Sequence, residues 1–268
     1  MLSSLFLFLT EPRKSDKTQY SKFAGRNYTH RGLYTRDQSV PENSLKAFEL
    51  SCENDYGIEF DVHLMSDGTL AICHDNDIFR VCGEHRLLSE MTGDELKGTR
   101  LFGTDEHIPT LNEMLSLVDG RVPLIVEMKV DNGNYNELAS SVWEVLREYN
   151  GLFCVESFDP RAVMWFNRHQ QNVYRGQLCS SYSVLSKTAP KLAAFAVSHM
   201  LTNFLTRPHF IAHSRDKKSL PVKICELMGA RSFVWANDDE RRAEEYQLDN
   251  DGIIFEFYKP RAKYYKEL

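Results

Sequence analysis

Gly57-Ile58-Glu59-Phe60-Asp61-Val62-His63 is an apolar run interrupted by two carboxylates. Side chains two residues apart in a strand share a face, so Glu59 and Asp61 are expected to point the same way. A second run, residues 124–129, places Glu127 and Lys129 together on one face in the same manner. Nearly continuous apolar runs of this kind are typical of strands in a parallel sheet that is covered on both sides.

Short β-rich runs alternate with longer stretches of helical spacing along the chain. Eight strands are expected, at residues 27–30, 57–63, 124–129, 152–158, 173–178, 210–213, 232–236 and 252–256. Amphipathic helical segments are expected between them, including residues 44–53, 135–149, 159–169, 219–228 and 238–247. This alternation predicts an α/β fold, a (β/α)8 TIM barrel. A doubly wound open sheet is the alternative, but no Gly-rich turn follows the first strand.

Local signals indicate where helices begin and where one connection is longer than usual. Asn43, Asp159 (with Pro160 at the first helical position) and either Asn237 or Asp238 are expected N-caps. After the second strand come a turn, a short extra strand at residues 70–74 and a polar run. Connections between strand and helix are normally short, so a small insertion at about 76–108 is expected beside the site. The barrel domain is expected to span residues 23–268.

The composition is that of a folded protein with a small-molecule partner. The 268 residues carry a formal net charge of −6, and 42 % of them are apolar, which argues against disorder. Lys and Arg are not clustered, so no nucleic-acid partner is expected. Six scattered cysteines without a CxxC pair predict buried, reduced thiols rather than a zinc site.

The first 22 residues are expected to form a tail outside the barrel. The apolar run at residues 2–9 covers about half a bilayer span and lacks the basic region and cleavage site of a signal peptide. A disordered or surface-packed segment is therefore expected, with a remnant of a membrane anchor as the alternative. The predicted location is the cytoplasm, with weak membrane association through the N-terminus left open.

Polar residues gather where barrel enzymes build their sites, at the carboxyl ends of the strands. His30 follows the first strand and His74 follows the short extra strand, while Glu59, Asp61 and Glu127 lie on strands that are otherwise apolar. Burying a carboxylate is costly unless it is paired or bound to a metal. The sequence therefore predicts either a metal site or a salt-bridge cluster, in which Glu127 would pair with Arg31 or Lys129.

Three carboxylates without a cysteine suit a hard divalent cation, Mg²⁺ or Ca²⁺. Two histidines and two basic residues beside such a cation favour phosphodiester hydrolysis, because the positive charges neutralise phosphate oxygens and the imidazoles move protons near neutral pH. His63, His85, His107, His169, His199 and His209 are interpreted as structural.

Ordered motifs from about residue 30 to residue 254 resemble the glycerophosphodiester phosphodiesterases, which belong to the phospholipase-C-like phosphodiesterases. These motifs are His30-Arg31-Gly32, Pro41-Glu42-Asn43-Ser44, Ala47-Phe48, Gly57-Ile58-Glu59-Phe60-Asp61-Val62, Asp67-Gly68, His74-Asp75, Glu127-Met128-Lys129, Ser157-Phe158-Asp159, Val234-Trp235 and Asp251-Gly252-Ile253-Ile254. The chain departs from the family pattern near its C-terminal end, where Trp235 is followed by Ala-Asn-Asp and Ile254 by Phe-Glu-Phe-Tyr.

The resemblance implies a barrel enzyme that hydrolyses glycerophosphodiesters to an alcohol and sn-glycerol 3-phosphate with a divalent cation. By position, Glu59, Asp61 and Glu127 match the metal ligands, and His30 and His74 match the acid/base pair. The remaining matches are the phosphate contacts Arg31 and Lys129, the rim carboxylate Glu42 and the aromatic residue near the glycerol group, Trp235. The attacking group would be water or the glycerol 2-hydroxyl, and the sequence does not assign the acid and base roles.

The sequence leaves four alternative functions to compare with glycerophosphodiester hydrolysis. A lysophospholipid or glycerophosphoinositol substrate would keep the chemistry and change the leaving group. A phosphatidylinositol phospholipase C has a related barrel, but the Glu-x-Asp and Glu-x-Lys pairs favour a metal centre. A non-catalytic barrel that binds a glycerophosphate would have no use for two proton-transfer groups, and a purely structural barrel would leave the charged residues apart in space.

Overall fold

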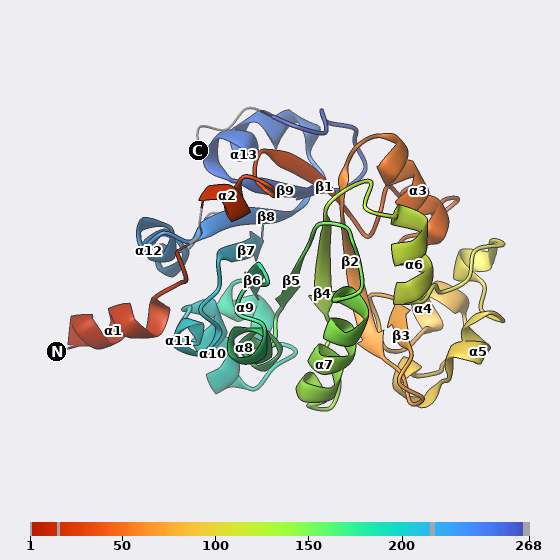
Figure 1. Ribbon diagram of the computed structural model, residues 1–268, viewed down its shortest axis with the longest axis horizontal. Helices are drawn as coiled ribbons and strands as arrows, with labels where there is room; N and C mark the ends of the chain where they lie inside the picture. The colour runs from red at the N-terminus through yellow and green to blue at the C-terminus, as the bar shows by residue number, and fades with distance from the viewer. Residues whose placement is uncertain (1, 15–16, 215–217, 265–268) are drawn as a thin grey trace.

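A closed barrel forms the centre of the computed structural model, which describes residues 2–14, 17–214 and 218–264. The strands follow the order β1-β9-β8-β7-β6-β5-β4-β2-β3, and an additional pairing between β1 and β2 closes the ring (Figure 1). The eight barrel strands are parallel, whereas β3 runs antiparallel to β2. The predicted (β/α)8 barrel is therefore confirmed. The strands are β1 (Arg26–His30), β2 (Gly57–Leu64), β3 (Leu70–Ile72), β4 (Leu124–Met128), β5 (Phe153–Ser157), β6 (Arg175–Cys179), β7 (Phe210–Ser214), β8 (Arg231–Asn237) and β9 (Gly252–Phe255).

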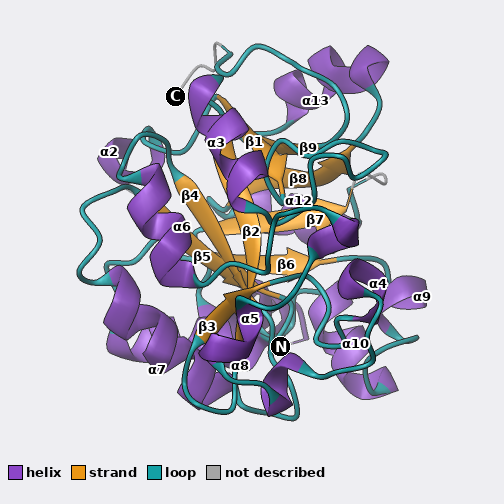
Figure 2. Ribbon diagram, turned by 90° about the vertical axis from the view of Figure 1, so that its right-hand side faces the viewer, coloured by secondary structure: helices purple, strands orange, loops and turns teal. Residues whose placement is uncertain are grey.

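Helices surround the sheet on its outer side (Figure 2). The α-helices are α1 (Leu2–Thr10), α2 (Lys17–Tyr20), α3 (Leu45–Glu53), α4 (Phe79–Cys82), α5 (Gly93–Leu96), α6 (Leu111–Val118), α7 (Tyr135–Leu146), α8 (Pro160–His169), α9 (Tyr182–Leu185), α10 (Lys191–Ser198), α11 (Asn203–Thr206), α12 (Leu220–Leu227) and α13 (Ala243–Asp249). The described residues also form the short 3₁₀ helices η1 (Leu88–Glu90), η2 (Leu101–Gly103) and η3 (Glu240–Arg242).

The strands divide their side chains between two apolar cores. Phe60 of β2 and Val126 of β4 belong to the core beneath the covering helices, together with residues of α3, α6, α7 and α8. Ile125, between two such residues, belongs instead to a second core with Tyr28, Cys154, Phe210 and Phe233, which come from four other strands. Because successive side chains of a strand point to opposite faces, Glu59, Asp61 and Glu127 point to the barrel interior, on the same face as Ile125.

Glycines on the strands make room for the aromatic rings of the inner core. A Cβ on Gly57 would lie 2.3 Å from the ring of Tyr28, and a Cβ on Gly176 would lie 2.2 Å from the ring of Phe210. Real Cβ atoms do not approach other heavy atoms so closely, so a side chain at either position would displace the ring. These two residues therefore allow large side chains to fill the barrel below the carboxylates.

The predicted helix starts are correct in one case and wrong in two. Asp159 caps α8 by accepting a hydrogen bond from the Arg161 amide, and Pro160 occupies the first helical position. The cap of α3 is Ser44, not Asn43, because Asn43 has a φ of 53° and its side chain turns toward the barrel. The last predicted helix begins with η3, which Asp239 caps in place of Asn237 or Asp238.

The segment predicted as an insertion, at about 76–108, contains α4, η1, α5 and η2. Its apolar residues, which include Ile78, Leu88 and Leu101, form a small core together with Met65 and Ala71 from the preceding segment. At the N-terminus, α1 lies outside the barrel, where the carbonyl of Thr10 accepts hydrogen bonds from Asn203 (3.0 Å) and Cys225 (3.3 Å). Among the described residues, no helix has the length and apolar character needed to span a bilayer. All six cysteines are free thiols.

Candidate active site

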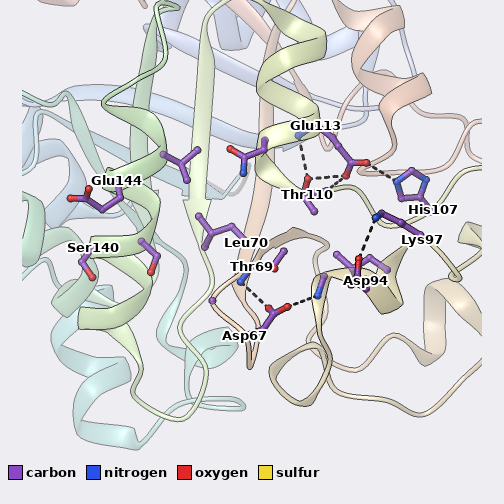
Figure 3. A pocket seen from close by; sticks show the side chains of 16 residues that line it. Asp67, Thr69, Leu70, Asp94, Lys97, His107, Thr110, Glu113, Ser140 and Glu144 are labelled. Atoms are coloured by element: carbon purple, nitrogen blue, oxygen red, sulfur yellow. Dashed lines mark hydrogen bonds and ion pairs between the residues drawn. The ribbon is translucent and has the colours of Figure 1, made fainter.

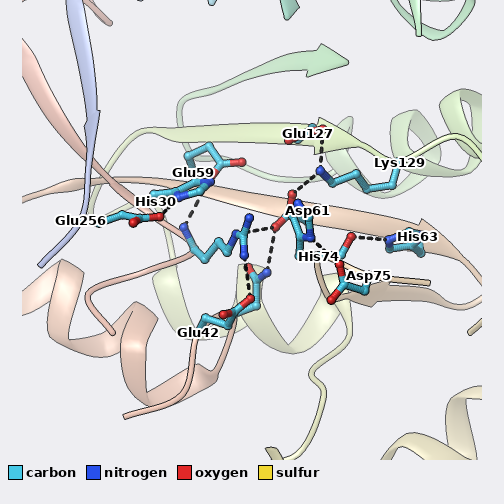
Figure 4. A network of polar contacts seen from close by, with 12 residues as sticks. His30, Glu42, Glu59, Asp61, His63, His74, Asp75, Glu127, Lys129 and Glu256 are labelled. Carbon is cyan, nitrogen blue, oxygen red and sulfur yellow. Dashed lines mark hydrogen bonds and ion pairs between the residues drawn. The ribbon is translucent and has the colours of Figure 1, made fainter. Parts of the chain in front are cut away.

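Three carboxylates meet inside the barrel at the ends of two neighbouring strands. Asp61 on β2 is in register with Glu127 on β4, and Glu59 lies two residues before Asp61 on the same face. One oxygen from each of the three lies within 4.8 Å of the other two, and all three side chains are buried (Figure 4). The structure therefore brings together the three predicted metal ligands.

Two basic side chains share this cluster. The Lys129 Nζ lies 2.9 Å from an oxygen of Asp61 and 2.7 Å from an oxygen of Glu127, and the Arg31 Nε lies 3.5 Å from the other oxygen of Asp61. The ion pair of Glu127 with Lys129 that the salt-bridge alternative predicted is therefore present. It does not account for Glu59, whose Oε1 is buried and has no hydrogen-bond partner among the described residues.

The carboxylates differ in their electrostatic environment. Burial would raise the pKa of Asp61, but the charges of Lys129 and Arg31 outweigh it and hold this pKa well below its usual value. Burial, followed by the charges of Asp61 and Glu127, raises the pKa of Glu59 well above its usual value. Burial also raises the pKa of Glu127, to about 7. With all three carboxylates ionised, the cluster carries three negative charges against the two positive charges of Lys129 and Arg31, so an additional cation would stabilise this ionised state.

The donor set fits a hard divalent cation. Mg²⁺ and Ca²⁺ prefer carboxylate oxygens, and this cluster offers oxygens from three carboxylates and no thiol. Glu156 on β5, opposite Glu127 in the strand register, is a further buried carboxylate on the same strand face, and its Oε2 also has no hydrogen-bond partner among the described residues. Buried oxygens without a hydrogen-bond partner are expected where an ion binds.

Both predicted proton-transfer histidines lie in this network, and a carboxylate holds the Nδ1 of each. The His30 Nδ1 contacts Glu256, and its Nε2 lies 3.8 Å from Glu59. The His74 Nδ1 is 2.6 Å from an oxygen of Asp75. Burial lowers the pKa of His74 below its usual value, although the hydrogen bond to Asp75 opposes this shift. In Figure 4, His30 lies beside Glu59 and His74 lies beside Asp61.

Glu42 lies next to the cluster but is held by arginines. It accepts a hydrogen bond from Arg31 at 2.8 Å and two from Arg80 of α4, at 2.8 and 3.0 Å. Its two oxygens are thus engaged by two guanidinium groups, and Glu42 positions Arg31 beside Asp61. Arg80 comes from the predicted insertion, so this segment is tied directly to the site.

Trp235 lies apart from the polar network. Its indole Nε1 donates to the carbonyl of Ala212 at 3.1 Å, and its ring packs edge-on against Phe158, with 5.6 Å between the ring centroids. Both residues stand at carboxyl ends of barrel strands, so Trp235 borders the same mouth as the carboxylates. No polar contact joins it to them within the described part of the chain.

The network also contains residues that were not among the predicted site residues. Asn43 donates to the Oδ2 of Asp61 at 2.9 Å, Arg80 holds Glu42, Glu256 contacts His30, and Asp75 holds the Nδ1 of His74. Glu256 and Asp75 carried a usable signal, since Glu256 directly follows the last strand, as His30 closes the first, and Asp75 directly follows His74. His63, interpreted as structural, bonds Asp131 at 2.6 Å and the main-chain carbonyl of His74 at 3.2 Å, and so supports the loop that carries His74.

A cavity of about 740 Å³ lies away from this cluster, between the insertion, α6 and α7 (Figure 3). Its carboxylates are already engaged, for example Asp67 by the amides of Thr69 and Gly93, and Glu113 by Thr110. None of the residues assigned to the carboxylate cluster lines it. This cavity is therefore separate from the carboxylate cluster at the barrel mouth.

Comparison with known proteins identifies the family. The model of the glycerophosphoryl diester phosphodiesterase family matches residues 30–259. A glycerophosphodiester phosphodiesterase from Caldanaerobacter subterraneus is 31% identical over 247 residues, which cover 84% of this chain and 91% of that protein.

Solved structures show the same fold. A phosphodiesterase from Oleispira antarctica, solved in complex with the product sn-glycerol-3-phosphate, aligns with a TM-score of 0.72 at 21% identity, over 88% of this chain and 94% of that one. A glycerophosphodiester phosphodiesterase from Parabacteroides distasonis aligns with a TM-score of 0.67 at 26% identity, over 87% and 93% of the two chains. The chain therefore belongs to the glycerophosphoryl diester phosphodiesterase family of phosphoric diester hydrolases.

Proposed function

We propose that this protein hydrolyses glycerophosphodiesters to an alcohol and sn-glycerol 3-phosphate, with Mg²⁺ or Ca²⁺ held by Glu59, Asp61 and Glu127. The observation that carries the proposal is the meeting of these three buried carboxylates, beside two histidines whose Nδ1 atoms are already bound to carboxylates. The activity named for the Caldanaerobacter relative and the product bound in the Oleispira structure support the same reaction.

The basic residues are proposed to bind the phosphodiester. When bound, the cation supplies Lewis-acid stabilisation of the negative charge that develops on phosphate oxygens. Lys129 and Arg31 place two further positive charges at the cluster, and Glu42 and Arg80 fix the position of Arg31. The phosphate group is thereby oriented for attack before any bond changes, which is a large part of catalysis of this kind.

The two histidines are proposed to move the protons. Because Glu256 and Asp75 occupy the Nδ1 atoms, the Nε2 atom of each imidazole is left to face the substrate. One imidazole accepts a proton from the nucleophile, either water or the glycerol 2-hydroxyl, as the oxygen attacks phosphorus. With the 2-hydroxyl the first product is a cyclic phosphate, which water then opens to give sn-glycerol 3-phosphate. The other donates a proton to the alkoxide as its bond to phosphorus breaks.

Release of sn-glycerol 3-phosphate from glycerophosphocholine tests the proposed reaction. We expect turnover by the purified protein, loss of turnover after treatment with a chelator, and recovery when Mg²⁺, Ca²⁺ or Mn²⁺ is added back. A coupled assay for glycerol 3-phosphate measures the rate. A folded protein that hydrolyses none of several glycerophosphodiesters with any of these cations would contradict the proposal.

Glu256 is proposed as a positioning residue, because it contacts His30 and does not belong to the carboxylate cluster. We expect Glu256→Gln to lower kcat about a hundredfold with little change in KM, since a misplaced catalytic group costs about that much. Glu256→Asp should recover part of the loss. The exposed Glu244→Gln on α13 is the matched control. An unchanged kcat in Glu256→Gln would show that His30 does not depend on this contact.

A further inference from the structure

Helices α9 and α10 expose large apolar side chains. Leu192 is 81% exposed, Val184 47%, Phe195 45% and Tyr182 40%. The rings of Tyr182 and Phe195 pack edge-on with 6.5 Å between their centroids, so the two helices present one continuous surface. Contiguous exposed apolar groups of this kind mark an interaction site more often than scattered ones do.

The chain segment that carries this surface has charged side chains of one sign. Residues 160–214 contain no Asp or Glu, although the chain has 38 in 268 residues and about eight would be expected in a segment of this length. Lys187 and Lys191 are both exposed on the same segment, and neither pairs with a carboxylate among the described residues. The surface of Tyr182, Val184, Lys187, Lys191, Leu192 and Phe195, here the α9–α10 face, is thus apolar and cationic.

The α9–α10 face borders the barrel mouth. Helix α9 begins three residues after the carboxyl end of β6, which is the end of the strands at which barrel sites are built. On their buried sides, Leu185 of α9 and Ala194 of α10 pack against Phe158, and Phe158 packs against Trp235. Two layers of side chains therefore separate the exposed face from Trp235 at the mouth: the buried side chains of α9 and α10, and Phe158.

We propose that the α9–α10 face binds an anionic lipid surface and so sets the barrel mouth against it. Apolar side chains insert at the boundary between headgroups and acyl chains, while neighbouring lysines bind anionic headgroups. The charge complementarity selects this partner over a second copy of the chain, whose equivalent face carries the same two lysines. This inference goes beyond the proposed hydrolysis and does not depend on it.

Co-sedimentation with vesicles tests this inference in the full chain. We expect binding to vesicles that contain phosphatidylglycerol and phosphatidylcholine, weaker binding to phosphatidylcholine alone, and a fall in binding as salt is raised. Lys187→Glu combined with Lys191→Glu should weaken binding about a hundredfold, because each attractive charge becomes repulsive. Leu192→Ser should weaken it about tenfold.

Two controls separate this face from other surfaces. Leu248→Ser on α13 removes a leucine that is 82% exposed on another part of the molecule and should leave vesicle binding unchanged. All of these variants should keep the wild-type rate on soluble glycerophosphocholine, so loss of vesicle binding is distinguishable from failure of the proposed hydrolysis. The inference is overturned if the lysine variant binds vesicles as the wild type does, if Leu5→Ser on α1 abolishes binding instead, or if sedimentation shows the face buried in a dimer.

Discussion

Replacing Glu59 with glutamine is expected to lower kcat/KM on glycerophosphocholine about a thousandfold, which corresponds to about 4 kcal/mol of transition-state stabilisation. Glu59 provides one of the three cluster oxygens, and its Oε1 has no hydrogen-bond partner among the described residues. A neutral amide at this position keeps the shape of the side chain and removes a charged ligand. The loss should therefore arise from weaker binding of the cation and not from a changed fold.

The same substitution is expected to leave the metal-free protein as stable as the wild type, or more stable. Burial and the neighbouring carboxylates raise the pKa of Glu59 in the folded state, so above its unfolded pKa the folded protein binds more protons at this residue than the unfolded protein does. The stability that protonated Glu59 contributes is therefore fully present below pH 4.5 and is lost as the pH rises from about 4.5 through the folded-state pKa of this residue. Glutamine has no such titration, so at pH 7.5 the variant avoids this loss.

Thermal unfolding with and without cation measures both effects at once. In the wild type at pH 7.5, Mg²⁺ or Ca²⁺ at about a hundred times its Kd should raise Tm by about 5 °C or more. In Glu59→Gln this rise should be absent, although the metal-free Tm is not lowered. Glu49→Gln, an exposed carboxylate paired with Arg121 outside the cluster, is the matched control and should keep the rise. A Glu59→Gln protein with a normal cation response would refute the assignment of this ligand.

Strand periodicity made the centre of the site predictable. Glu59, Asp61 and Glu127 interrupt apolar runs, and the two-residue repeat of a strand fixes their common face without any knowledge of the loops. The parallel order of β2 and β4 then sets Asp61 opposite Glu127. The eight barrel strands followed from the same local pattern, and each was placed within one or two residues of its observed ends.

The contacts that depend on loop conformation were not predictable in this way. Asn43 was expected to cap α3, but its left-handed backbone turns its amide toward Asp61, and no local pattern announces such a turn. Arg80 reaches Glu42 from the insertion, so this contact depends on how the insertion folds against the barrel. Helix α6 did have a local signal that was overlooked, the capping box formed by Thr110 and Glu113 before an apolar segment.

Replacing either proposed proton-transfer histidine is expected to lower kcat by about a hundredfold to ten-thousandfold. His30→Gln and His74→Gln should both keep the rise in Tm on adding cation, because neither histidine is among the three proposed ligands. The double variant should be little slower than the slower single variant, since the two groups act in one reaction and their effects are not additive. Steady-state rates and the cation-induced rise in Tm, measured on the same preparations, check both statements.

The leaving group distinguishes the two histidines. An aryl alcohol such as p-nitrophenol departs without protonation, so an ester of glycerol phosphate with p-nitrophenol does not need the general acid. We expect one of the two single variants to recover most of its rate on this substrate and the other to remain slow. The histidine whose loss is recovered is the one that protonates the alkoxide, and the other activates the nucleophile. If both variants stayed equally slow, or if both recovered, the assignment of one histidine as acid and the other as base would be wrong. The shared arrangement, in which Glu256 holds the Nδ1 of His30 and Asp75 holds that of His74, would then have to serve substrate binding.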